Sequence, residues 1–313
     1  MNLSRRRLLA QACCGSIFAA AVPGSSGSGE PGKTRLILLG TAGGPSPKKS
    51  RAAPSQVILS RDSAFVVDCG NGVARQLILA GVPLPRIRHI FLTHHHSDHN
   101  ADYGTLLLLA WSTGLRTRVD AWGPPPLKRI TRLFLEMSAP DIEVRRSDQG
   151  QPPLGPLIHA HELTAGGPVI EDQGIRVGCA RVDHPLVPAA FAYRFDGADR
   201  SIVVSGDTRR SESLITLARG ADVLVHEALY PDAVNAIAGT GPGSAQLRKH
   251  LVDSHTSVEE AGKIAAEAGV KTLVLSHFVP AETPAVPDEA WLDGAKRHFS
   301  GRVILGRDLL EID

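Results

Sequence analysis

Aromatic residues are scarce in this chain, and neither sign of charge dominates it. Trp, Tyr and Phe make up 4% of the 313 residues, which argues against a single-stranded nucleic-acid binder built on stacked aromatic side chains. The 34 Lys and Arg residues nearly balance 32 Asp and Glu residues, so the composition provides no general basic surface for a polyanion. Hydrophobic residues at 42% and charged residues at 21% are close to globular averages, which excludes wholesale disorder.

Long apolar runs are also missing, and the apolar run near the N-terminus is shorter than the roughly 20 residues that span a bilayer. Arg5–Arg7 precede that run, Ala19–Ala21 follow it as a small-residue cleavage site, and residues 4–9 resemble a twin-arginine export signal. We therefore expect a signal peptide at 1–21, a flexible leader at 22–33, and a periplasmic or secreted protein with no stable membrane span after cleavage. An ordinary amphipathic N-terminus is the alternative.

Cysteine is rare too. Of the four cysteines, only Cys69 and Cys179 lie beyond the expected signal, and two cysteines make no disulfide framework. They could pair in an oxidising compartment, or both could be unpaired core residues. Removing 1–21 deletes three Arg and no acid, which leaves 31 basic against 32 acidic residues, a net charge of −1.

From residue 34 onward, short apolar runs alternate with turn residues, and no linker interrupts the chain. The spacing predicts helices at 71–80, 211–219 and 257–268, and strands at 35–40, 55–60, 64–68, 89–93, 174–182, 190–195, 201–205, 223–226 and 272–276. One α/β domain over 34–313, built from two sheet-plus-helix halves, is the economical interpretation.

A histidine cluster directly follows the strand predicted at 89–93. It reads His94-x-His96-x-Asp98-His99, so four candidate metal ligands lie within six residues. Alternation along an extended segment sends His94 and His96 to one side, and a turn can bring the other two to an adjacent position. Imidazole and carboxylate groups suit Zn²⁺ in a catalytic site. A solvated His-rich loop is the competing interpretation.

The cluster and its order in the chain resemble the metallo-β-lactamase superfamily, and the resemblance extends over 34–313. It implies an αβ/βα sandwich, in which two mixed sheets pack face to face with helices outside. His184, Asp207 and His277 match the family's later ligand positions. The resemblance assigns one zinc to His94, His96, His184 and Asp207, and the other zinc to Asp98, His99, Asp207 and His277. Mn²⁺ or Fe²⁺ stays open at one position.

The family's chemistry implies a hydrolase, because water held between two metals ionises near neutral pH and can attack an ester. Asp98 would hold a metal and orient that water. Asp68 matches a carboxylate that supports a ligating histidine. Two segments, 221–228 and 255–261, resemble the ribonuclease Z branch. They make His255 the candidate proton donor, with His226 and Glu227 orienting its loop.

Three features argue against a tRNA-processing member of that branch. Only 22 residues, 185–206, separate His184 from Asp207, which leaves no room for a long tRNA-clamping insertion. Export and a net charge near zero also argue against tRNA. Other segments resemble exported arylsulfatase-type members and suggest a pocket lined by Tyr103, Trp111 and Phe278, although each of these could be core packing instead.

The expectation is therefore an exported two-zinc hydrolase of a small-molecule sulfate or phosphate ester, in the arylsulfatase-like group, with no strong nucleic-acid footprint. The alternatives are a ribonuclease Z-like phosphodiesterase or endoribonuclease, and then a lactonase or thioesterase. Analogy with the branch also suggests a homodimer. The remaining histidines are expected to be structural or to lie on the surface: His89, His95, His159, His161, His250 and His298.

Overall fold

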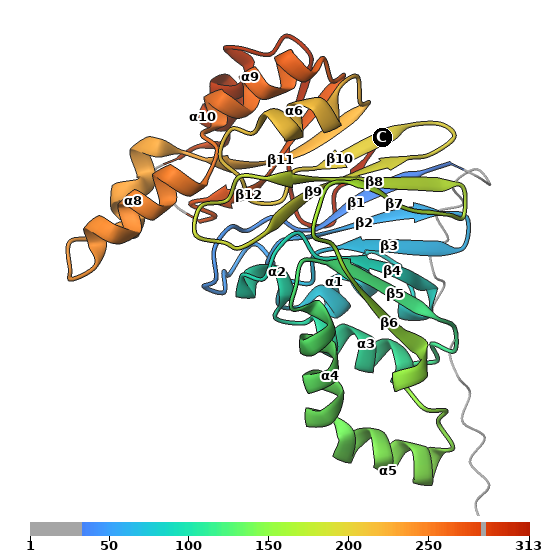
Figure 1. The fold of residues 1–313 in the computed structure, drawn as a ribbon. Helices are drawn as coiled ribbons and strands as arrows, with labels where there is room; N and C mark the ends of the chain where they lie inside the picture. The colour runs from blue at the N-terminus through green and yellow to red at the C-terminus, as the bar shows by residue number, and fades with distance from the viewer. Residues whose placement is uncertain (1–32, 283–285) are drawn as a thin grey trace, which may run out of the picture. The chain divides into compact units, whose positions relative to one another are not determined.

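Two seven-stranded mixed sheets pack face to face, and helices cover their outer faces (Figure 1). The computed structural model describes residues 33–282 and 286–313. The first sheet has the order β14-β1-β2-β3-β4-β5-β6, and the second has the order β13-β12-β11-β10-β9-β8-β7. This arrangement confirms the αβ/βα sandwich.

The first sheet combines the N-terminal strands with the last strand of the chain. Its strands are β1 (Arg35–Gly40), β2 (Ser55–Ser60), β3 (Ser63–Val67), β4 (Ile87–Phe91), β5 (Val119–Gly123), β6 (Ile158–Glu162) and β14 (Glu311–Ile312). The strands of the second sheet are β7 (Gly167–Asp172), β8 (Ile175–Val182), β9 (Ala190–Asp196), β10 (Ser201–Val204), β11 (Val223–Leu229), β12 (Thr272–Val279) and β13 (Arg302–Leu305).

Most central strands are apolar along their whole length, because both faces of each sheet are covered. In β1, Leu36 and Leu38 join the core between the sheets, while Ile37 and Leu39 join the core beneath the helices of the first sheet. The core between the sheets contains Phe91, whose ring meets the Tyr193 ring edge-on at 5.3 Å between centroids.

Helices cover the first sheet and extend beyond it: α1 (Val73–Leu79), α2 (Ser97–Asn100), α3 (Tyr103–Ser112), α4 (Leu127–Met137) and α5 (Ala139–Gln149). On the second sheet lie α6 (Glu212–Ala218), α9 (Val258–Ala268) and α10 (Asp288–Lys296). Between β11 and α9 the chain makes a helical hairpin of α7 (Val234–Ala238) and α8 (Ser244–Ser254), which projects at the left of Figure 1. Short 3-10 turns occupy Leu84–Arg86, Gly155–Leu157 and Pro231–Ala233.

The structure decides between the two alternatives for the cysteines. Cys69 and Cys179 are both buried and free, and they belong to different apolar cores. Burial raises the pKa of both thiols, so neither is activated. In the described part of the chain, no helix is long and apolar enough to cross a membrane. The expected signal at 1–21 and nearly all of the expected leader at 22–33 lie outside the described residues.

Candidate metal centre

The histidine cluster leaves the end of β4 and turns into the short helix α2. His94 is fully buried on the extended segment, and α2 carries Asp98 and His99, which are also buried. Extended backbone followed at once by a helical turn points all of these side chains toward the second sheet, as the spacing of the motif predicts.

The other three candidate ligands come from strand ends of the second half. His184 follows β8 and Asp207 follows β10, while His277 lies within β12. At His277 the pairing of β12 with β11 shifts register by one residue, and its backbone takes a φ of 45°. A bulge re-aims a side chain at the cost of backbone strain, and here it directs the imidazole to the edge where the other ligands converge.

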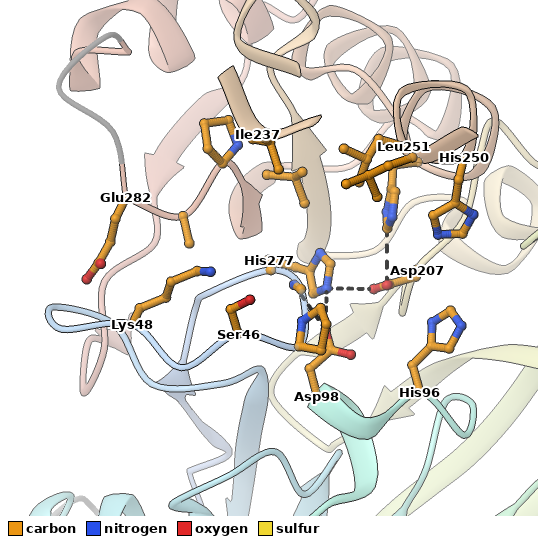
Figure 2. Close-up of a pocket in the computed structure, with 18 of the residues that line it drawn as sticks. Ser46, Lys48, His96, Asp98, Asp207, Ile237, His250, Leu251, His277 and Glu282 are labelled. Carbon is orange, nitrogen blue, oxygen red and sulfur yellow. Dashed lines mark hydrogen bonds and ion pairs between the residues drawn. The ribbon is translucent and has the colours of Figure 1, made fainter. Parts of the chain in front are cut away.

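The seven side chains form two groups that share Asp207. The first group is His94, His96, His184 and Asp207, and the second is Asp98, His99, Asp207 and His277. The two carboxylate oxygens of Asp207 divide between the groups. Oδ1 lies 3.2 Å from Nε2 of both His99 and His277, while Oδ2 faces His94 Nε2 at 3.9 Å. Figure 2 shows the contact between Asp207 and His277.

The spacing of these atoms and their lack of partners fit a pair of metal ions. Ligands about 2.0–2.1 Å from a tetrahedral zinc lie about 3.3–3.4 Å apart, and His184 Nε2 is 3.3 Å from His96 Nδ1. Among the described residues, Nε2 of His94 and of His99 and Oδ1 of Asp207 are buried without a hydrogen-bond partner. Such unpaired buried atoms are costly unless an ion satisfies them.

Electrostatics point to a cation at the same place. Burial alone would lower the pKa of His99, but the carboxylates of Asp207, Asp68 and Asp98 outweigh burial and raise it well above its ordinary value. Three carboxylates thus converge on one imidazole in a site shielded from water. A bound cation would compensate the excess negative charge.

Supporting hydrogen bonds fix the orientation of the ligand histidines. His99 donates from Nδ1 to Asp68 Oδ2 at 2.8 Å, and Asp68 also accepts from the backbone N–H of Thr93. His184 donates from Nδ1 to the Ser254 carbonyl at 3.1 Å. In each ring the bond at Nδ1 leaves Nε2 free to face the centre. Asp68 lies where the sequence predicts it, whereas nothing in the sequence indicated Ser254.

His255 forms a buried pair with Glu227 beside the two groups. Its Nδ1 lies 2.7 Å from Glu227 Oε2 and 4.0 Å from Asp207 Oδ2, and Glu227 is held by the Thr208 backbone N–H at 2.6 Å. Burial lowers the pKa of His255, but the charge of Glu227 and the hydrogen bond to it raise that pKa to about 9. The pairing with Glu227 therefore favours the protonated form of His255.

His226 and His95 both turn away from the centre. His226 donates from Nδ1 to the backbone carbonyl of Glu227 at 2.8 Å, and among the described residues it is Glu227, and not His226, that forms a hydrogen bond with His255. His95 lies 2.8 Å from the Pro124 carbonyl, as alternation along the strand predicts.

A cavity of about 690 Å³ opens over the two groups (Figure 2). Asp98, Asp207, His255 and His277 line its base, while the loop after β1 and helices α7 and α8 form its walls. The remaining wall residues include Gly44, Ser46, Lys48, Ile237, Leu247, His250, Leu251, Pro280 and Glu282.

The expected aromatic pocket is wrong, because none of its three residues lines this cavity. Tyr103 and Trp111 are buried beneath the first sheet, where Tyr103 contacts the Thr131 hydroxyl and Trp111 donates to the Pro152 carbonyl. Phe278 packs against Trp291 and under the Arg51 guanidinium. Each is a packing residue, the alternative that the sequence left open.

His250 was expected to be structural or on the surface, yet it faces the cavity. Its ring centroid lies between 6.1 and 6.4 Å from those of His255, His184 and His96. No spacing rule indicates this position, because His250 precedes His255 by five residues, a separation that does not place two side chains on one face of a helix.

With the fold and the centre in view, comparison with known proteins defines the family. The family model described as "Beta-lactamase superfamily domain" matches residues 64–278. Ribonuclease Z of Mycobacterium bovis is 36% identical over 281 residues, which cover 89% of this chain and 97% of the relative. The chain therefore belongs to the metallo-β-lactamase superfamily, in its ribonuclease Z branch, and is a metal-dependent hydrolase of ester bonds.

Solved structures show the same fold. Human tRNase Z, short form, matches with a TM-score of 0.66 at 23% identity, over 89% of this chain and 98% of that one. The metallo-beta-lactamase fold protein YhfI from Bacillus subtilis matches with a TM-score of 0.65 at 22% identity, over the same shares of the two chains.

These relatives overturn two expectations. The arylsulfatase-like function is wrong, because curated relatives that match nearly the whole chain are named ribonuclease Z. The expected small-molecule ester and the expected lack of a strong nucleic-acid footprint are wrong for the same reason. Net charge misled because it averages over the entire surface, whereas metal ions held by the seven candidate ligands would supply positive charge locally.

Proposed function

We propose that this chain is a two-zinc phosphodiesterase that cleaves RNA in the manner of its ribonuclease Z relatives. The observation that carries the proposal is the position of the His255–Glu227 pair, which lies against Asp207 where the two ligand groups meet. The identity of 36% to ribonuclease Z over most of both chains supports the same substrate class.

The residues of the centre suit zinc, since they are imidazoles and carboxylates at tetrahedral spacing. When bound, the two metals supply Lewis acidity at the phosphate and lower the pKa of the attacking water. Asp98 orients that water, and the Gly44 backbone N–H holds the carboxylate in place by donating to Asp98 Oδ2 at 3.1 Å.

His255 gives its proton to the departing oxygen of the substrate. Because Nδ1 is bonded to Glu227, the proton available to substrate is the one on Nε2, and the negative charge of Glu227 keeps the ring protonated until the bond breaks. His255 also lines the cavity, so a bound phosphodiester can reach it.

The direct test is cleavage by zinc-loaded protein of an RNA that carries a folded tRNA followed by a single-stranded extension. We expect cleavage that depends on zinc and is abolished by a chelator. A wild-type protein that is fully loaded with metal and cleaves no RNA phosphodiester would refute the proposal.

We also propose that residues 1–21 direct export and are removed. The support is the Arg5–Arg7 run followed by the small residues Ala19–Ala21. Mass spectrometry of the N-terminus, on protein recovered from the periplasm or the medium, should show a start near Val22. An intact Met1 on the recovered protein would contradict export.

A further inference from the structure

Helix α8 ends at the metal centre. His250 and Ser254 lie four residues apart on one face of the helix, and His255 follows directly as its C-cap in extended backbone. The Ser254 carbonyl accepts from His184, and His255 pairs with Glu227. Ser254 and His255 thus each bond to a residue of the centre, whereas His250 bonds to none of the candidate metal ligands.

His250 is placed to meet substrate rather than metal. It lines the cavity, yet it belongs to neither of the ligand groups whose atoms lie within 4.8 Å of one another. Figure 2 shows its ring above the gap between Asp207 and His96, with one edge turned toward the open space. Its ring centroid lies 6.4 Å from that of the candidate ligand His96 and 6.3 Å from that of His184, so a substrate group bound at the centre would lie within its reach.

The contact with Ser254 determines which nitrogen of His250 carries the proton. The Ser254 side chain is buried, and its hydroxyl has one partner among the described residues, His250 Nδ1 at 3.2 Å. A buried hydroxyl hydrogen needs an acceptor, so Nδ1 accepts and the N–H of a neutral ring lies on Nε2. Burial and the nearby positive charge of His255 lower the pKa of His250, which favours that neutral ring.

The remainder of the wall formed by α7 and α8 is apolar. Leu247 and Leu251 lie on the same face of α8 as His250, and Ile237 joins them from α7. Leu247 and Ile237 stay 40% and 38% exposed within the wall. The cavity volume of about 690 Å³ falls in the usual range of small-ligand sites.

We propose that His250 is a substrate-binding residue, whose Nε2–H donates to a non-bridging oxygen of the scissile phosphodiester while the nucleotide lies against Leu247, Leu251 and Ile237. The inference rests on the proposed function for the nature of the substrate. It gives the α7–α8 hairpin a role in recognition, separate from the metal ligands of the sheet edge.

The test is binding to zinc-loaded protein of a dinucleotide whose scissile P–O bond is replaced by an uncleavable P–CH₂ bond, measured by calorimetry. His250→Ala should weaken binding by about tenfold to a hundredfold, the usual effect of losing a hydrogen bond to a charged group. His250→Gln keeps an N–H donor and should restore most of the affinity. Gln246→Ala, at an exposed position of the same helix, is the matched control and should change nothing.

Two results would overturn the proposal. One is equal affinity of wild type and His250→Ala. The other is loss of zinc together with affinity in both His250 variants, since His250 would then act through the centre. The readout is binding, so this test is separate from the test of the proposed function. A wild type that binds the analogue but cleaves no RNA would refute the proposed function. The affinities of wild type and His250→Ala would still decide whether His250 binds the substrate.

Discussion

The Asp207 carboxylate belongs to both ligand groups, because each of its oxygens faces a different set of imidazoles. Burial would raise the pKa of Asp207, but His277 and His99 outweigh burial and hold that pKa well below its ordinary value. Asp207 is therefore ionised in the folded protein and ready to bind cations on two sides.

Replacing Asp207 by Ala should remove metal from both positions and abolish turnover. We expect at least a hundredfold loss of activity, since removal of even an outer supporting carboxylate costs about 10- to 100-fold. Metal analysis of purified protein, with the exposed Asp148→Asn as control, checks this. Full metal content in Asp207→Ala would show that the ligand assignment is wrong.

His255→Ala should lower turnover of RNA by about 10²- to 10⁴-fold without changing metal content, as expected for loss of a general acid. The loss should be much smaller for bis(p-nitrophenyl) phosphate, whose leaving group departs without a proton. Comparing kcat for the two substrates tests the role. An equal loss on both would assign His255 to binding rather than to proton donation.

At the same scale, the sequence predicts the seven candidate ligands and one orienting group, Asp68, but not the Ser254 carbonyl that orients His184 or the position of His250 at the cavity. The ligands can be predicted because they are polar residues that directly follow an apolar strand, as in the motif His94-x-His96. Ser254 acts through its backbone carbonyl, which every residue possesses, so residue type gives no sign of it. In the sequence His250 resembles other surface residues of a helix, and only the folded structure shows that α8 places it in the wall of the cavity.

At the scale of elements, the centre depends on how the strands of the second sheet align. Asp222 precedes β11 and accepts from the backbone N–H and the hydroxyl of Ser201 on β10, at 2.7 and 2.8 Å. It also pairs with Lys271, which precedes β12, at 2.6 Å. These contacts hold together the beginnings of the three strands that lead to Asp207, Glu227 and His277.

Asp222→Asn should destabilise the protein at neutral pH but not in acid. Partial burial raises the pKa of Asp222, but Lys271 and Ser201 outweigh it and lower the pKa from 3.8 to about 2. The depressed pKa stabilises the fold fully above pH 3.8, and this contribution is lost as the pH falls toward 2. Thermal melting should show a deficit of about 2–4 °C at pH 7 that shrinks below pH 4. A deficit that is independent of pH would contradict this account.

Elements with strong periodicity could be predicted from the sequence, and elements shaped by the site could not. The helix expected at 257–268 forms as Val258–Ala268, because its apolar face recurs at helical spacing. The strand expected at 272–276 continues to Val279 through the bulge at His277, where the register is set by the neighbouring strand. Tyr103 and Trp111 were expected in a pocket because their segments resemble those of arylsulfatase-type proteins, but both side chains are fully buried by packing.

At the scale of the molecule, the two sheets pack face to face and the centre lies at their shared edge, while the chain carries a formal net charge of +2. Among the cavity-lining residues of the described part, Lys48 is the one side chain that is a permanent cation. RNA binding should therefore depend on the metals and the cavity more than on a basic surface.

The KM for RNA should rise less than about tenfold between 50 and 200 mM salt. A protein that neutralises 6–10 phosphates with Lys and Arg loses roughly 10³- to 10⁵-fold in affinity over that range. Steady-state kinetics at four salt concentrations are sufficient. A steep dependence of that size would show a basic binding surface that net charge conceals.

The measurement that tests the central claim most directly compares one preparation of zinc-loaded protein on two ester classes. Values of kcat/KM would be determined for a single-stranded RNA phosphodiester and for p-nitrophenyl sulfate, with Asp207→Ala alongside as the metal-site control. The assignment to the ribonuclease Z branch predicts zinc-dependent cleavage of the RNA and no measurable hydrolysis of the sulfate. Sulfate hydrolysis without RNA cleavage would contradict it.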